Sequence, residues 1–308
     1  MGTPEFSVPC LKQLITDGHE VVLAVTQPDK PKGRGNRMTP PPVKEYALSA
    51  GVAVYQPDTM RSDEVYETLR SYGSDAIVTV AYGKILPQRV LDLPRLGCIN
   101  VHASLLPKYR GSAPIQWAVL NGETVSGVTT MFMDAGIDTG AMLEKCEVVV
   151  TPNMTAGELH DVLSEVGAKL LSVTLDKLEQ GTLTPSAQDD TQSCYAPMLT
   201  KALCAMDFSR SAQQLHDQVR GLNPWPTAVC RFGGKALKVH MSRVGEATSA
   251  APGTVCSLSP FAVACGDGVS LILEQVQYEG GKRMPAVDFL RGHTAALGMS
   301  LAEDCADG

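Results

Sequence analysis

The polar residues with the clearest chemical potential in this 308-residue chain follow one short apolar segment. The segment Cys98–His102 (CINVH) reads as a buried β-strand, and it contains Asn100 and His102. Because residues two apart on a strand point to the same face, these two side chains would project together. The carboxyl end of a parallel strand opens on the crevice in which such folds bind ligands. The sequence therefore predicts a paired amide and imidazole beside a ligand crevice.

A second polar cluster, Met133–Gly140 (MDAGIDTG), lies between two further strand-like runs and contains Asp138. Its glycines allow unusual backbone angles. An amide N–H can stabilise an oxyanion, an imidazole can move a proton, and a carboxylate can orient the imidazole. Together these groups suit transfer of an acyl group to an amine, which is itself the nucleophile. Taken alone, an Asn or His at a strand end is more often a structural hydrogen-bonding residue, and the second cluster is more often a turn.

Strand-like and helix-like segments alternate through the first two-thirds of the chain. Strands are expected at 19–26, 52–56, 75–81, 98–102, 127–133 and 141–150, and helices at 8–17, 43–50, 62–72, 113–121 and 155–180. Thr155 and Glu158 form a capping box for the last helix, and residues 27–42 read as a proline-rich loop. The alternation predicts an α/β fold with a Rossmann-like, doubly wound parallel sheet.

The alternation stops after residue 183. Residues 184–204 read as a linker, and 205–308 contain one helix followed by short strands separated by Gly and Pro. We therefore expect a catalytic domain at 1–183, a linker at 184–204, and a small C-terminal β-barrel domain, OB-like in form, at 205–308.

Composition narrows the class of protein. An apolar content of 44% is enough for a sizeable core, and no apolar run approaches the roughly 20 residues of a membrane helix. The nine cysteines are widely spaced without a C-x-x-C pair, which favours a reducing, cytoplasmic setting and no metal site. The net charge of −7 opposes binding to a polyanion, but the segment from Arg220 to Arg243 holds five basic residues and no acidic one.

The run from Asn100 to Pro114, NVHASLLPKYRGSAP, resembles the signature of the folate-dependent formyltransferases. The resemblance implies that Asn100, His102 and Asp138 form the catalytic triad and that the formyl donor is 10-formyltetrahydrofolate. It also implies that the folate lies beside two segments. These comprise Ser104, Leu105, Leu106 and Pro107, and Val80, Tyr82 and Gly83.

The sequence is similar, over nearly its whole length, to the branch that formylates methionyl-tRNA. The segments GTPEF, TQPDKPKGRGNR and NPWP carry this similarity. The resemblance implies that a basic loop enters the acceptor stem of the initiator tRNA, with Arg34 as its key residue. The expected tRNA contacts are Lys30, Lys32, Arg34, Arg37 and Lys44 in the loop, and Arg220, Arg231, Lys235 and Lys238 in the C-terminal domain. We expect a cytoplasmic monomer.

Two alternatives stay open at this point. One is a formyltransferase acting on a sugar nucleotide, and the other is an inactive tRNA-binding protein on the same fold. The resemblance also implies a strand of about six residues before GTPEF, where this sequence has Met1 alone. Without that strand we expect exposed strand edges and exposed apolar surface near the centre of the sheet.

Overall fold

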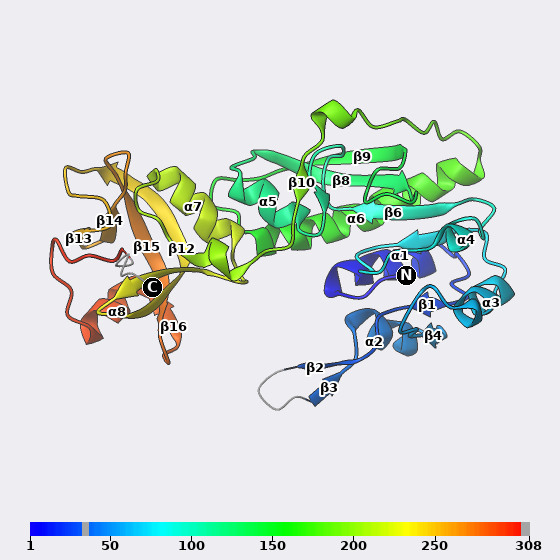
Figure 1. Ribbon diagram of the computed structural model, residues 1–308, viewed down its shortest axis with the longest axis horizontal. Coiled ribbons are helices and arrows are strands. Elements are labelled where there is room, and N and C mark those ends of the chain that lie inside the picture. The colour runs from blue at the N-terminus through cyan, green and yellow to red at the C-terminus, as the bar shows by residue number, and fades with distance from the viewer. Residues whose placement is uncertain (33–36, 303–308) are drawn as a thin grey trace. The chain divides into compact units, whose positions relative to one another are not determined.

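The structure is a computed structural model that describes residues 1–32 and 37–302 (Figure 1). The chain divides into two compact units, and each is discontinuous in sequence. The first comprises Met1–Ser112, Val125–Val149 and His160–Ala196, and the second comprises Ala113–Thr124, Val150–Leu159 and Pro197–Gly308. The predicted domain boundaries at 183 and 205 stay predictions.

The first unit is mixed α/β. Its principal strands are β1 (Ala24–Val25), β4 (Val54–Tyr55), β5 (Ile77–Thr79), β6 (Cys98–His102), β8 (Val125–Phe132) and β9 (Met142–Val149). Its helices include α1 (Val8–Thr16), α2 (Pro42–Ser49), α3 (Asp63–Ser71) and α4 (Gln88–Leu91). The strands form a two-stranded sheet, β1–β4, and a four-stranded sheet in the order β5–β6–β8–β9.

The expected parallel pairing does not extend to β8 and β9. Pairing is parallel in β1–β4 and β5–β6, but β6–β8 and β8–β9 are antiparallel. The connection between β8 and β9 is too short for the crossover of about a dozen residues that parallel neighbours need. These two strands therefore form a hairpin and lie side by side in Figure 1.

The helix α6 (Ala156–Glu179) begins as its capping box predicts. The Glu158 N–H donates to the Thr155 hydroxyl at 3.2 Å, and the Thr155 N–H donates to the Glu158 carboxylate at 2.8 Å. Further along, Gly167 lies so close to Val101 that an added Cβ would be 3.0 Å from that side chain. The helix thus packs tightly against β6, the strand that carries Asn100 and His102.

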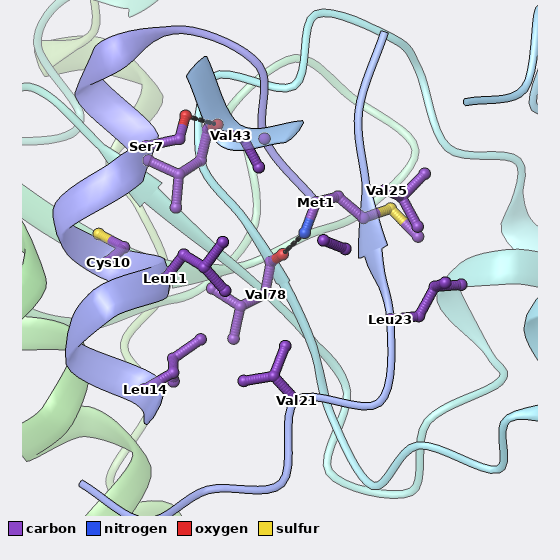
Figure 2. A pocket seen from close by; sticks show the side chains of 13 residues that line it. Met1, Ser7, Cys10, Leu11, Leu14, Val21, Leu23, Val25, Val43 and Val78 are labelled. Atoms are coloured by element: carbon purple, nitrogen blue, oxygen red, sulfur yellow. Dashed lines mark hydrogen bonds between the residues drawn. The ribbon is translucent and has the colours of Figure 1, made fainter. Parts of the chain in front are cut away.

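A pocket lies between β1 and β5, beside the first residue of the chain (Figure 2). The Met1 ammonium donates to the Val78 carbonyl at 2.5 Å, and the Gly2 N–H donates to the Val25 carbonyl at 3.0 Å. Met1 and Gly2 thus contact both sheets at once. Burial lowers the pKa of this ammonium from 8.0 to about 6. The other walls are apolar and include Leu11, Leu14, Val21, Leu23 and Val43.

Two predicted strands beside this pocket are shorter in the structure than the sequence indicated. The predicted strands 19–26 and 75–81 are shortened to β1 and β5. Val21 and Leu23 line the pocket in non-strand backbone (Figure 2). A strand segment without a neighbour has no ladder of hydrogen bonds to define it, which accounts for the short strands.

The second unit is mostly β. Its strands are β11 (Ala228–Phe232), β12 (Lys235–Ala247), β13 (Val255–Leu258), β14 (Phe261–Ala264), β15 (Val269–Tyr278) and β16 (Arg283–Pro285), and its helices are α5 (Pro114–Leu120), α7 (Ala212–Gly221) and α8 (Ala286–Gly292). The strands pair in the order β11–β12–β15–β14–β13, with β16 on β15. Phe232, Phe261 and Phe289 pack together in its core. Within the described residues, no helix is both long and apolar enough to cross a membrane.

Candidate active site

Three predicted side chains meet at the end of β6. Asn100 and His102 lie on β6, and Asp138 lies in the connection between β8 and β9. β8 is the antiparallel neighbour of β6 and ends with Phe132 opposite Ile99, so the connection that carries Asp138 begins beside β6. The Asn100 amide donates to Asp138 Oδ1 at 3.3 Å, and His102 Nδ1 is 3.6 Å from Asp138 Oδ2. The structure therefore brings the amide, the imidazole and the carboxylate together.

The imidazole of His102 is held from its other side. Its side chain is only 6% exposed, and Nε2 lies 2.9 Å from the Tyr109 carbonyl. Since a carbonyl can only accept, Nε2 carries a proton and donates it to this bond. Nδ1 is then the ring nitrogen that faces the carboxylate of Asp138.

The backbone around this group is held in unfavourable conformations. Tyr109 has φ of 61° and Asp138 has φ of 53°, in the left-handed region that residues other than glycine seldom adopt. The Gly111 N–H, two residues after Tyr109, donates to Asp138 Oδ2 at 2.8 Å. Such strain persists only where neighbouring contacts over-determine the geometry, and it clusters at functional sites.

The predicted linker contributes contacts that the sequence did not indicate. Within it, β10 (Tyr195–Ala196) pairs in parallel with β7 (Arg110–Gly111). Gln188 donates to the backbone carbonyls of Asp138 and Gly140, each at 2.8 Å, and accepts from the Arg110 guanidinium. Residues 184–196 thus pack on the candidate site, and no local sequence signal marked them.

The first predicted folate segment, Ser104–Pro107, directly follows the strand that carries His102. Ser104 and Leu106 are buried. The Ser104 hydroxyl donates to the Lys108 carbonyl at 2.7 Å, and the Leu106 N–H donates to Thr129 at 3.1 Å. These bonds define the shape of the segment, and Leu105 and Pro107 retain partial exposure.

The second predicted folate segment follows β5, the parallel neighbour of β6. Val80 and Tyr82 are each 3% exposed. The phenol of Tyr82 donates to Met60 Sδ at 3.1 Å, and burial raises the pKa of this phenol to about 12. Their side chains are therefore core residues, so a ligand at this segment would meet the backbone and Gly83. A Cβ on Gly83 would come within 2.5 Å of the Gln27 side chain.

The basic loop contains a short hairpin, where the sequence predicted no regular structure. Its strands β2 (Lys30–Lys32) and β3 (Arg37–Thr39) pair in antiparallel register. Arg34 lies outside the described residues. Lys44 binds both oxygens of Asp29 at 2.8 and 2.9 Å, which lowers the pKa of that carboxyl. Lys44 therefore anchors the base of the hairpin, whereas Arg37 is exposed.

The predicted basic residues of the second unit divide into two groups. Arg231 and Lys238 are exposed on the neighbouring strands β11 and β12, where Arg231 pairs with Ala236 and Lys238 with Val229. That register places both side chains on the same face. Lys235, also exposed, lies 5.9 Å from the centre of the Tyr278 ring.

The predicted tRNA contact of Arg220 is corrected by the structure. Its side chain is 6% exposed, and its guanidinium binds Asp217 at 2.7 Å and the Met154 carbonyl at 3.2 Å. A basic residue paired in the interior offers no surface to a phosphate. Charge counting failed here because Asp217, one helical turn earlier, lay just outside the segment that was counted.

Comparison with known proteins gives consistent matches along the chain. The formyl transferase family matches residues 1–175, and the formyl transferase C-terminal domain matches residues 198–294. The methionyl-tRNA formyltransferase of Trichlorobacter lovleyi is 49% identical over 303 residues, which span 98% of this chain and 95% of that protein. The methionyl-tRNA formyltransferase of Acidobacterium capsulatum is 51% identical over 298 residues, with 96% of each chain covered.

Solved structures share the fold at low identity. The N-formyltransferase from Helicobacter canadensis, in complex with folinic acid and dTDP-3-aminofucose, superposes with a TM-score of 0.66 at 18% identity. That match covers 88% of this chain and 96% of the other. HypX from Aquifex aeolicus, in complex with tetrahydrofolic acid, gives a TM-score of 0.58 at 17% identity, over 80% of this chain and 43% of HypX.

Proposed function

Since the chain belongs to the methionyl-tRNA formyltransferase family, we infer that it transfers a formyl group to the α-amino group of methionyl-tRNA. The enzyme thereby supplies N-formylmethionyl-tRNA for translation initiation. The observation that carries this reading is near-half identity to methionyl-tRNA formyltransferases over almost the entire chain. We propose 10-formyltetrahydrofolate as the donor, initiator methionyl-tRNA as the acceptor, and the cytoplasm as the location. The oligomeric state we propose is a monomer.

We propose that Asn100, His102 and Asp138 carry the chemistry. The methionyl amine attacks the formyl carbon, so a C–N bond forms and the carbonyl oxygen becomes an oxyanion. The Asn100 amide is suited to donate to that oxyanion, a contact typically worth about 10²–10³ in rate. The bond from the formyl carbon to the folate nitrogen then breaks. The proton lost by the amine is transferred to that nitrogen, and no external base is consumed.

The contacts at the end of β6 support separate roles for His102 and Asp138. His102 can stabilise the oxyanion and deliver the proton to the leaving nitrogen. Asp138 orients His102 and assists removal of the amine proton. The strained backbone at Tyr109 and Asp138 supports this assignment, because strain of this kind gathers where geometry is functionally constrained.

We place the folate beside Gly83 and the segment Ser104–Pro107, at the neighbouring ends of β5 and β6. For the tRNA we propose contacts from the β2–β3 hairpin, including Lys30, Lys32, Arg34 and Arg37. Arg231, Lys235 and Lys238 would meet backbone phosphates, a contact that carries no sequence information. Lys44 contributes by holding the hairpin through Asp29.

Two finer features of the fold belong to the same proposal. We propose that the first unit is a Rossmann-like layered domain with an antiparallel extension formed by β8 and β9. We also propose that the second unit curves into a small OB-like barrel. The register of β12 against β15 shifts at three places, and such irregularities increase strand curvature.

The test is transfer of radiolabelled formyl from 10-formyltetrahydrofolate to initiator and elongator methionyl-tRNA in parallel. We expect strong labelling of the initiator alone. A folded protein that labels neither tRNA but labels an amino-sugar nucleotide would contradict the proposal. A gel shift with tRNA in the absence of any transfer would indicate a binding protein instead.

A further inference from the structure

Gln188 makes four hydrogen bonds that join the two sides of the candidate active site. Its Nε2 donates to the carbonyls of Asp138 and Gly140, each at 2.8 Å. Its Oε1 accepts from Arg110 Nε at 3.0 Å and from Arg110 Nη2 at 2.8 Å. Both amide hydrogens and both oxygen lone pairs are therefore used. A half-buried glutamine between exposed neighbours is not needed to fill the core.

The chemistry of these partners requires an amide at this position. Backbone carbonyls only accept hydrogen bonds, and a guanidinium only donates them. A glutamate would match Arg110 but repel the two carbonyls, and a lysine would match the carbonyls but repel Arg110. The amide cannot be reversed either, because its NH₂ would then face the guanidinium. Gln188 thus has one orientation and no charged substitute.

Two of the residues that Gln188 binds, Asp138 and Arg110, determine where the carboxylate of Asp138 lies. On one side Gln188 holds the Asp138 carbonyl, in a residue whose φ of 53° is unfavourable. On the other side it holds Arg110, and the next residue, Gly111, donates its N–H to Asp138 Oδ2 at 2.8 Å. The same side chain therefore restrains the backbone of Asp138 and the segment that binds its carboxylate.

We propose that Gln188 is a positioning residue that holds Asp138 in its reactive orientation for formyl transfer. The inference rests on the proposed role of Asp138. Gln188 is not among the proposed reacting groups. It acts through its hydrogen bonds to Asp138 and Arg110. Since small misplacements of a catalytic group are costly, loss of this restraint should lower kcat by about 10- to 100-fold. The KM values for folate and tRNA should change little.

The experiment compares Gln188→Met with Gln192→Met in the full-length enzyme. Gln192 is an exposed glutamine of the same segment, and its amide donates to Asp189 at 2.8 Å. We expect the first variant to lose kcat at unchanged KM and the second to behave as the parent. Gln188→Glu should lose as much as Gln188→Met, because both lack the bonds to Asp138 and Gly140. Parent-like activity of Gln188→Glu would overturn the backbone restraint.

A double-mutant cycle with Asp138→Ala separates positioning from general stability. If Gln188 acts through Asp138, adding Gln188→Met to Asp138→Ala should lower kcat no further. An equal fold-loss in both backgrounds would overturn the inference, since the effect would then be independent of Asp138. Undiminished activity of Asp138→Ala alone would instead contradict the proposed role of Asp138. The two failures are therefore distinguishable.

Discussion

The carboxylate of Asp138 lies 3.6 Å from the imidazole Nδ1 of His102, beyond the range of a direct hydrogen bond. The same carboxylate is bonded to the Asn100 amide and to the Gly111 N–H. Its position is thus fixed by groups other than His102. In ligand-free enzymes such catalytic contacts are often long and tighten when substrate binds. This relationship gives each of the three side chains a separately testable role.

Replacing His102 by Ala should lower kcat by about 10²–10⁴-fold, because the side chain that we propose as proton donor to the leaving nitrogen is lost. Folate binding should be nearly intact, since the neighbouring segment keeps its own hydrogen bonds through Ser104 and Leu106. Formyl transfer and folate affinity are measured on the same preparation. His19→Ala, on a partly exposed histidine distant in sequence from the site, serves as the control. Unchanged kcat in His102→Ala would remove His102 from the mechanism.

Asn100→Asp should lower kcat by at least about 10²-fold. The substitution removes the amide donor and places a second carboxylate next to Asp138, whose Oδ1 is 3.3 Å from the present amide nitrogen. Two carboxylates at this distance raise the pKa of one of them, so the pH profile of kcat should change shape as well. Steady-state kinetics across pH provide the measurement. A parental profile with parental kcat would show that this amide has no part in the reaction.

Gly140→Ala should destabilise the protein by about 1–3 kcal/mol. An added Cβ would be 1.9 Å from the Phe132 carbonyl oxygen, a backbone atom that cannot rotate away. Gly292 has no atom within 4 Å of such a Cβ, so Gly292→Ala is the matched control. Chemical denaturation of both variants tests the difference. Equal midpoints would mean that the connection between β8 and β9 adapts without cost.

Arg37→Ala should raise the KM for methionyl-tRNA and leave kcat at saturating tRNA unchanged. Arg37 is exposed on β3, and a phosphate contact adds affinity without entering the chemistry. The dependence of binding on salt should become shallower by about one counterion. Arg70→Ala removes an exposed arginine from α3 and should alter neither quantity. A salt dependence identical to that of the parent would argue against a phosphate contact at Arg37.

Stability of the chain beginning at Met1 should rise between about pH 6 and pH 8. Burial lowers the pKa of the Met1 ammonium from 8.0 to about 6. In this interval the unfolded chain binds more protons than the folded one, so the free energy of unfolding increases with pH. A difference of two pKa units corresponds to about 2.7 kcal/mol. Burial of the charged ammonium destabilises the folded chain by this full amount below pH 6 and no longer does so above pH 8.

His216 and His240, whose pKa values are lowered mainly by burial, act in the same direction. Acetylation of the Met1 amine abolishes its titration and leaves those of the histidines. The difference between acetylated and free chains in urea denaturation therefore isolates Met1. Parallel stability curves for the two forms from pH 5.5 to 8.5 would contradict the prediction.

Local patterns in the sequence predicted those elements whose determinants lie within a few residues. β6 has the predicted bounds, Cys98–His102, and the Thr155–Glu158 capping box forms as expected. The hairpin β2–β3 was missed because its prolines argued for a loop. Apolar periodicity could not specify that β8 and β9 run antiparallel, since it reports burial and carries no strand direction.

Contacts across long stretches of sequence account for what the site prediction missed. Asn100, His102 and Asp138 were predicted because their types and motifs indicated chemistry, and the structure brings their side chains together. Gln188 lies 78 residues from Arg110 and 50 from Asp138, in a segment without periodicity. Arg220 was misassigned because the counted segment stopped short of Asp217, its ion-pair partner three residues earlier. Its further contact with the Met154 carbonyl spans 66 residues. That contact and those of Gln188 leave no pattern in neighbouring residues.

The pocket beside Met1 lies between two parts of the first unit that should differ in their free energy of local opening. The β1–β4 pair and the β5–β6–β8–β9 sheet are bridged by backbone bonds from Met1 and Gly2, next to an apolar pocket. Regions with few buried contacts open at lower free energy than the rest of a protein. The amide of Ala24 should therefore exchange with solvent deuterium through a local opening, whereas that of Val101, under α6, should exchange only on global unfolding. The strand β6, which carries Asn100 and His102, would then stay folded while the β1–β4 pair opens.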